Sequence, residues 1–469
     1  MKILLIRPNL RGAPLETNIT GVYPPLGIAY LASVLRKAGH EAAILDNEIM
    51  IFGDGRVRNH VTSTRPDMVL ISCTTPLWKR AVDIGRIVKE VSDDIIVGIG
   101  GPHLSVYPRE TLAEPCFDFG MYGEGEETVL EAVSAAESGK SFESIKGCVV
   151  RNGKGVTITP PREEIEDLDS LPLPSIDLLP YRDYFALSVK RPFFSMVTTR
   201  GCPYRCAFCF QGYLGRYRSR SAENVVDEME TLVRKYGIRE IVMFDETFAV
   251  EKERAIRICD LVRERGISVR WSIRTRVDLM DRKLLSSLKA AGCYELHMGI
   301  ESGNQGVLDR MRKDTRLEDI RKAVGMAKQA GFIVRGYFML AYPGETRRTI
   351  TETIEFSKSL PLDWASFTVT IGLPGTEMYK KAMRDNVFGS DYWVDAASGA
   401  KAARKPYFVP DGMRVEDLFS LKRRAYLEFY KRPRIIKQVL MNIGIGDIIT
   451  CFPRFLRLMP GIYGSMARV

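Results

Sequence analysis

Residues 201–210 read Gly-Cys-Pro-Tyr-Arg-Cys-Ala-Phe-Cys-Phe and place three cysteines, Cys202, Cys206 and Cys209, close together. Three thiolates in a C-x3-C-x2-C loop can bind three irons of a cubane [4Fe–4S] cluster. The fourth iron then has no protein ligand and is open to a substrate. A structural zinc site usually has four ligands in paired spacings, and no nearby Cys or His completes such a set. The loop therefore predicts a redox-active iron–sulfur centre.

The sequence after residue 192 alternates apolar runs with helical patterns. Strands are expected at 193–199, 239–244, 268–273, 294–299, 333–340 and 364–371, with helices at 221–236, 251–265, 281–291, 316–330 and 346–359. Six such units predict an α/β fold over 193–375, a partial (β/α)6 TIM-type barrel. The cysteine loop follows the first of these strands, at the carboxyl end where barrel enzymes carry their chemistry.

Residues 1–150 show a second α/β pattern. Strands are expected at 2–7, 41–45, 68–72 and 95–99, with helices near 26–39, 78–91 and 125–138. This predicts a doubly wound, Rossmann-like parallel sheet that binds ligands beyond the carboxyl ends of its strands. The small or polar residues of the loops there are Thr74, Thr75, Gly100, Gly101, His103, Gly123 and Glu124. No G-x-G-x-x-G follows the first strand, which disfavours a dinucleotide.

Two further regions differ in composition. Residues 151–192 are rich in proline and acidic residues and are expected to form a linker. Residues 376–469 are expected to form a helical, basic C-terminal region, because 401–469 contain 14 Lys/Arg and 5 Asp/Glu, or +9 of the chain's +10. Such localised charge differs from that of a nucleic-acid-binding protein. It suits either peripheral contact with an anionic membrane at its inner face or a solvated helical cap on the barrel's open edge.

Cysteine usage and hydropathy indicate a cytoplasmic protein. The other six of the nine cysteines, at 73, 116, 148, 259, 293 and 451, are isolated and are expected to be small buried hydrophobes. The apolar run at the start, MKILLIRPNL, is too short before the first polar residues to be the apolar region of a signal peptide. No apolar run is long enough to span a bilayer.

The cysteine loop resembles the signature of the radical-SAM superfamily, C-x3-C-x-aromatic-C, which Cys202, Cys206, Phe208 and Cys209 match. The resemblance covers about 195–375. It implies that the open iron binds the amino and carboxylate groups of S-adenosylmethionine. One electron, from a reductase or a flavodoxin or ferredoxin, then cleaves the sulfonium and gives a 5′-deoxyadenosyl radical, which abstracts hydrogen from the substrate.

Later strand ends also look like the cofactor-contacting segments of that superfamily. Their residues are Asp245, Glu246, Arg274, Arg276, Glu301, Ser302, Gly303, Tyr342, Pro343, Gly344, Glu345 and 372–376. Carboxylates suit ribose hydroxyls and an ammonium group, and an arginine suits the methionine carboxylate. Ala341 stands where relatives often carry glycine.

The N-terminal region resembles the cobalamin-binding subfamily in residues 23–41 and in its three loops. None of the four histidines, at 40, 60, 103 and 297, lies in a D-x-H-x-x-G motif that would supply a cobalt ligand. His103 is therefore interpreted either as a lower-face ligand or as a hydrogen-bonding residue. The alternative is a Rossmann-like domain that binds nothing or only a partner.

The two resemblances together imply a cobalamin-dependent radical-SAM enzyme that methylates an unactivated carbon of a small molecule, with a lipid or isoprenoid-like compound as one hypothesis. The resemblance extends to the anaerobic magnesium-protoporphyrin ester cyclase, so oxidative cyclisation stays open, as does radical chemistry without cobalamin. A methylthiotransferase would need a second cluster, but Cys73, Cys116 and Cys148 are isolated. An electron carrier or a cobalamin sensor would not need an open iron.

Overall fold

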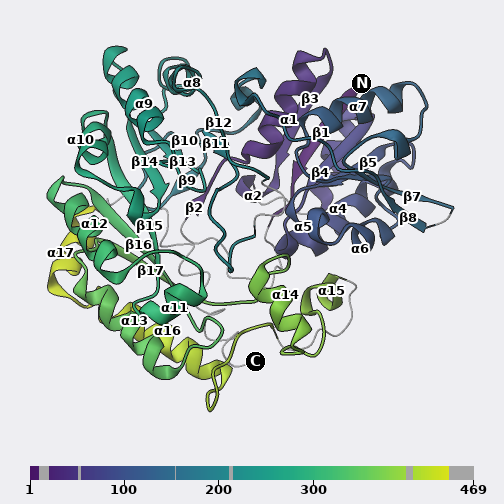
Figure 1. The fold of residues 1–469 in the computed structure, drawn as a ribbon. Coiled ribbons are helices and arrows are strands. Elements are labelled where there is room, and N and C mark those ends of the chain that lie inside the picture. Colours follow the sequence, from purple (N-terminus) through teal and green to yellow (C-terminus); the bar gives the residue numbers. More distant parts are fainter. Residues whose placement is uncertain (10–20, 51–53, 154, 211–214, 398–404, 443–469) are drawn as a thin grey trace.

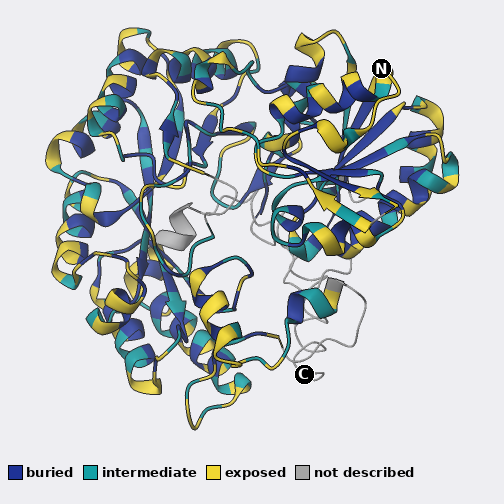
Figure 2. Ribbon diagram, turned by 45° about the vertical axis from the view of Figure 1, so that its right-hand side comes forward, coloured by how far each residue is buried: buried dark blue, intermediate teal, exposed yellow. Residues whose placement is uncertain are grey.

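The computed structural model describes residues 1–9, 21–50, 54–153, 155–210, 215–397 and 405–442. Two α/β bodies lie side by side, the N-terminal one purple and blue and the second teal and green in Figure 1. The strands of both sheets are mostly buried and the outer faces of the helices are exposed (Figure 2). Within the described residues, no helix is both long and apolar enough to cross a membrane.

The first body contains a seven-stranded sheet in the order β3-β1-β4-β5-β6-β7-β8. Its strands are β1 (Lys2–Arg7), β3 (Glu41–Asp46), β4 (Met68–Ser72), β5 (Ile96–Gly100), β6 (Phe119–Met121), β7 (Cys148–Asn152) and β8 (Gly155–Ile158). The first five are parallel, which confirms the Rossmann-like prediction. The antiparallel β7–β8 hairpin was not predicted, and it extends the sheet beyond residue 150, where the first region was expected to end.

Helices cover both faces of this sheet. On one face, α1 (Leu26–Lys37) and α7 (Glu126–Glu137) pack on the strands, and on the other face α3 (Asp54–Thr64) and α4 (Trp78–Val91) do so. The order of the strands reverses between β1 and β4. In such sheets ligands bind at the carboxyl ends of the strands beside this switch point.

The second body contains a six-stranded parallel sheet in the order β10-β13-β14-β15-β16-β17. Its strands are β10 (Phe193–Met196), β13 (Glu240–Met243), β14 (Arg270–Thr275), β15 (Cys293–Glu301), β16 (Ile333–Leu340) and β17 (Trp364–Val369). The intervening helices are α8 (Ala222–Arg234), α9 (Lys252–Glu264), α10 (Arg282–Ala290), α12 (Leu317–Gln329) and α13 (Arg347–Ser359). The second α/β body is confirmed, and the six predicted strands pair in one parallel sheet.

Helix α16 (Val415–Tyr430) covers the edge of β17. The hydroxyl of Tyr430 accepts a hydrogen bond from the amide of Ala365 (3.2 Å) and donates one to its carbonyl (2.9 Å). The hydroxyl of Tyr426 accepts from the amide of Phe367 (3.2 Å). This helix therefore covers the open edge of the barrel, as one of the two alternatives for the C-terminal region expected. The proposed membrane-contacting segment largely falls in 443–469, outside the described residues.

The segment expected to be a linker packs along both bodies. On the first body, strand β9 (Phe185–Ala186) pairs with β2 (Gly21–Val22), and the hydroxyl of Tyr184 donates to Asp46 (2.6 Å). On the second body, Asp169 accepts from the amide of Ser221 (3.0 Å), which precedes α8. The segment thus joins the bodies through specific contacts.

Candidate functional site

A short antiparallel hairpin forms the base of the cysteine loop. Strand β11 (Thr199–Arg200) pairs with β12 (Arg218–Ser219), and Arg200 lies opposite Arg218. Gly201 follows at once with φ = 77°, and a Cβ there would lie 2.3 Å from the carbonyl oxygen of Arg216. Only glycine therefore fits where the chain leaves the hairpin toward Cys202.

Later parts of the second body hold the loop in place. The amide of Ala207 donates to the carbonyl of Met311 (2.9 Å), and its carbonyl accepts from the amide of Met378 (3.0 Å). A Cβ on Gly375 would lie 2.3 Å from the ring of Phe210. The backbone of the loop is thus fixed by segments that follow β15 and β17.

The three thiols of this loop differ from the other described cysteines. Cys202, Cys206 and Cys209 are half-buried, whereas the remaining five are buried. Burial, with Glu246 nearby, raises the pKa of Cys209 to about 12, while Lys313 opposes this shift. Among the described residues, no three acidic, Cys or His groups converge as they would around one metal ion. A cubane cluster instead offers each thiol a separate iron, so this donor set fits such a cluster.

Two buried cations flank the thiols. Arg276 stacks on Tyr204 (3.8 Å), donates to the carbonyl of Lys313 (2.5 Å) and approaches the sulfur of Cys206 (3.8 Å). The Nζ of Lys313 lies 3.1 Å from Glu301 and 5.8 Å from the ring centre of Phe208. Arg276 also pairs with Asp278 (3.0 Å). Burial raises the pKa of Cys206, and Lys313 and Arg276 oppose this shift. Sequence reasoning missed Lys313, because a lysine in the run Met-Arg-Lys-Asp at 311–314 reads as solvated.

Asp245 lies in the interior beneath the loop. Its carboxylate accepts from the amides of Thr198 (2.7 Å) and Thr199 (2.6 Å) and from the hydroxyl of Thr199 (2.8 Å). These bonds fix the chain between β10 and the hairpin. The structure thus gives Asp245 protein partners, in place of the open position expected of a cofactor contact.

Glu246 and Arg274 are exposed at the ends of neighbouring strands, with the guanidinium of Arg274 4.0 Å from the ring centre of Phe244. Glu301 is nearly buried, with φ = 67°, and pairs with Lys313. Glu246 and Arg274 therefore remain open to a ligand, whereas Glu301 is already paired.

The turns after β15 and β16 are ordered by internal hydrogen bonds. Ser302 is fully buried and its hydroxyl lies 3.1 Å from that of Thr353. Tyr342 is also buried and donates from its hydroxyl to the carbonyl of Arg310 (3.2 Å), and Pro343 beside it is half-buried. Ala341 has φ = 63°, a conformation that favours glycine.

Glu345 should make stability depend on pH. Burial raises its pKa from 4.5 to about 7, although hydrogen bonds from the backbone of Tyr342 and from Thr349 oppose the shift. The folded state then holds the proton more tightly than the unfolded chain. Protonated Glu345 therefore contributes its full stabilisation of the fold below pH 4.5, and this contribution is lost as the pH rises through about 7.

The variant Glu345→Gln should therefore be more stable than the wild type by about 3 kcal/mol at most at pH 8, with no advantage near pH 4.5. Thermal unfolding midpoints of both proteins across this range measure the effect. A difference in unfolding midpoint that stays constant with pH would contradict the raised pKa of Glu345.

The loops expected to bind cobalamin come together at the carboxyl edge of the first sheet. The amide of Cys73 donates to the carbonyl of Gly100 (2.8 Å), and a Cβ on Gly101 would lie 2.8 Å from the carbonyl oxygen of Cys73. Thr74 is exposed and Thr75 half-buried beside them. Gly101 is therefore required by the close packing of these two loops.

His103 is fully buried in the same region. Its ring stacks on Trp78 (4.5 Å between ring centres), and Nδ1 lies 3.3 Å from the hydroxyl of Thr75. Burial lowers its pKa to about 4, so the ring is neutral at physiological pH. These contacts favour the hydrogen-bonding interpretation of this histidine.

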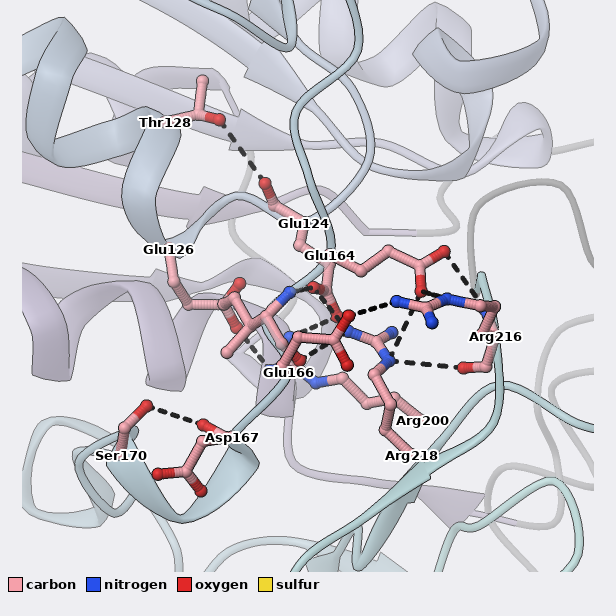
Figure 3. A network of polar contacts seen from close by, with 11 residues as sticks. Glu124, Glu126, Thr128, Glu164, Glu166, Asp167, Ser170, Arg200, Arg216 and Arg218 are labelled. Carbon is pink, nitrogen blue, oxygen red and sulfur yellow. Dashed lines mark hydrogen bonds and ion pairs between the residues drawn. The ribbon is translucent and has the colours of Figure 1, made fainter.

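Gly123 and Glu124 follow β6 at the same edge. Gly123 is exposed with φ = 77°. Glu124, however, accepts hydrogen bonds from Arg200 (2.9 Å) and Arg218 (2.9 Å) of the cysteine-loop hairpin, as Figure 3 shows. The carboxyl edge of the first sheet therefore contacts the base of the cysteine loop, and Glu124 is occupied by protein partners.

Polar and aromatic side chains of β15 and β16 form a further group that sequence reasoning did not single out. His297 Nδ1 lies 2.8 Å from the hydroxyl of Tyr337, and Arg335 donates to Glu295 (3.0 Å). Burial lowers the pKa of His297 to about 4. Tyr23, from the first body, packs edge-on against Phe244 (5.0 Å between ring centres) on the strand-end side of β13.

Comparison with known proteins gives two family matches. Residues 196–357 match the radical SAM superfamily, and residues 13–133 match the B12 binding domain. An uncharacterized methyltransferase of Pyrococcus horikoshii is 34% identical over 450 residues, 95% of this chain and 96% of that protein. The anaerobic magnesium-protoporphyrin IX monomethyl ester cyclase of Rubrivivax gelatinosus is 31% identical, over 81% of this chain and 70% of that protein.

The fold is also known from solved structures. The methyltransferase TsrM of Kitasatospora setae, with cobalamin and a [4Fe–4S] cluster bound, superposes with a TM-score of 0.73 over 95% of this chain and 90% of that chain, at 19% identity. The matched domains, the long alignment to the P. horikoshii protein and the cysteine loop at the end of β10 agree. The chain therefore belongs to the cobalamin-dependent radical-SAM methyltransferase family, whose cofactors are a [4Fe–4S] cluster, S-adenosylmethionine and cobalamin.

Proposed function

We propose that this protein transfers a methyl group to an unactivated carbon of a small molecule. The contact between Glu124 and the cysteine-loop hairpin carries the proposal, because it brings the carboxyl edge of the Rossmann-like sheet against the loop of the three thiols. When bound, the cluster with S-adenosylmethionine supplies a 5′-deoxyadenosyl radical and cobalamin carries the methyl group. Two cofactors that act on one substrate carbon need neighbouring sites, and this contact supports such an arrangement.

The residues of the chain would have distinct tasks in this reaction. Cys202, Cys206 and Cys209 would hold the cluster. Exposed Glu246 and Arg274 would bind the polar groups of S-adenosylmethionine, since an arginine pairs well with a carboxylate. The loops with Thr74, Thr75, Gly100, Gly101 and Gly123 would cradle cobalamin. The neutral pair His297 and Tyr337 would hydrogen-bond the substrate.

Anaerobic reconstitution with iron, sulfide and cobalamin tests the proposal. We expect about four irons and about one cobalt per chain, and release of 5′-deoxyadenosine after addition of a reductant. A sample reconstituted without cobalamin is the matched control and should release 5′-deoxyadenosine without forming a methylated product. Iron without cobalt in the complete sample would remove cobalamin from the reaction.

A lipid-like substrate is the specific class that we infer. Residues 435–463 combine apolar side chains with Lys437, Asp447, Arg454 and Arg457, a composition suited to an anionic lipid surface. Methyl-labelled S-adenosylmethionine would be incubated with the reconstituted protein and a cell extract, which is then partitioned. Label in the organic phase is expected, and label confined to the aqueous phase would contradict this class. Consumption of an extract component without label would favour the alternative, an oxidative cyclase.

A further inference from the structure

The cysteine-loop hairpin contains two positive charges at one position of its ladder. Arg200 and Arg218 are directly opposite one another in the β11–β12 pair, so their side chains lie on the same face. Like charges placed so destabilise a hairpin. The two strands of this hairpin flank the cysteine loop, so a negative charge that offsets the two arginines would also stabilise the base of the loop.

That charge comes from the first body. One oxygen of Glu124 accepts from Arg200 (2.9 Å) and the other accepts from Arg218 (2.9 Å), so a single carboxylate bridges the two opposed arginines (Figure 3). The amide of Ile165 donates to the second oxygen as well (2.7 Å). Burial raises the pKa of Glu124, but the hydrogen bonds from Arg218 and Arg200 outweigh it and leave the pKa below its ordinary value.

Other contacts in the network do not replace this bridge. Glu126 pairs with Arg200 (2.5 Å) and does not bridge the arginines. Glu164 lies 3.6 Å from Arg218, and Glu166 pairs with Arg216 at the exposed rim. The side chains of Glu124 and Arg218 are 12% and 6% exposed, whereas those of Glu166 and Arg216 are 71% and 69% exposed. The strongly held charges are therefore those at the centre of the network.

We propose that Glu124 is a positioning residue that closes the mouth of the cysteine loop. Its carboxylate neutralises the arginine pair at the base of the loop and so holds residues 199–210, which carry the three thiols, in place. The residue belongs to the loop after β6 that would also contact cobalamin through Gly123. The cluster site is thus completed by the cobalamin-binding body. The inference rests on the cluster assignment of the proposed function, and it requires no cobalamin to be tested.

The variant Glu124→Gln tests this role, since it removes the charge and preserves the shape. Amide hydrogen exchange of the cofactor-free protein should become about tenfold faster in residues 199–210, while exchange in β14 to β16 stays unchanged. In reconstituted protein, a chelator should remove iron about tenfold faster. The rim variant Glu166→Gln is the matched control and should behave like the wild type. Unchanged exchange in Glu124→Gln would overturn the proposal.

A double variant separates charge neutralisation from simple packing. Glu124→Gln with Arg218→Gln removes the repulsion, since Arg200 retains Glu126. Its exchange in 199–210 should return to within about threefold of the wild type. A double variant as loose as Glu124→Gln would overturn the role assigned to the charge. Failure to bind cobalamin would contradict the proposed methylation and would leave these exchange results unaffected.

Discussion

The variant Cys206→Ala is expected to lose S-adenosylmethionine cleavage by at least about a thousandfold, because the cluster loses one of its three protein ligands. Cys206 is half-buried, and Arg276 and Lys313 lie close enough to stabilise its thiolate. Without that thiolate the remaining two cysteines cannot hold a cubane cluster with a single open iron. Release of 5′-deoxyadenosine and iron per chain, both measured after anaerobic reconstitution, report the loss.

A buried cysteine provides the control for this variant. Cys259→Ala removes a fully buried thiol on α9 that packs as a small hydrophobe. We expect it to keep its iron and its cleavage rate and to lose only a modest amount of stability. Cleavage at the wild-type rate in Cys206→Ala would defeat the assignment of this loop.

Removing the buried cation at residue 313 should have the second largest effect. In Lys313→Met the carboxylate of Glu301, which is only 8% exposed, loses the ammonium group 3.1 Å away. An unpaired buried charge of this kind costs about 3 kcal/mol. We expect that loss in the free energy of unfolding of the barrel, measured by urea titration of the cofactor-free protein, together with a lower iron content after reconstitution.

The neighbouring residue and a second substitution serve as controls. Arg312 pairs with Glu377 at the surface, where both side chains are more than half exposed. Arg312→Met should therefore change stability by less than about 0.5 kcal/mol. The double variant Lys313→Met with Glu301→Gln removes both charges and should recover most of the loss. Equal instability of the single and double variants would show that packing of the lysine stem, and not its charge, is what matters.

The sequence predicted the strands that are long and buried. Residues 333–340 form β16 with the predicted limits, because six of its eight residues, IVRGYFML, are aliphatic, aromatic or methionine and favour a strand. Strand β6 has only three residues and gave no comparable pattern. The β7–β8 hairpin is antiparallel and partly exposed. Its sequence therefore lacks the continuous apolar run by which the buried parallel strands are predicted.

The three cysteines of the candidate site could be named from the sequence, whereas much of what surrounds them could not. The spacing of the cysteines is a local property, so the sequence displays it directly. The partners of Asp245 and Glu124 are not local, since Glu124 contacts residues 76 and 94 positions away in the chain. A carboxylate at a strand end looks the same in sequence whether it faces a ligand or an arginine from another domain.

The hydroxyl groups of Tyr426 and Tyr430 satisfy backbone groups of β17 without forming a ladder. A further strand at this edge would have to match β17 in register and length. The helix needs only two tyrosines four residues apart. The barrel can therefore end after six strands, without a seventh and an eighth strand to close it. The same arrangement makes solubility depend on the helix, because a chain lacking it would present a bare strand as a template for aggregation.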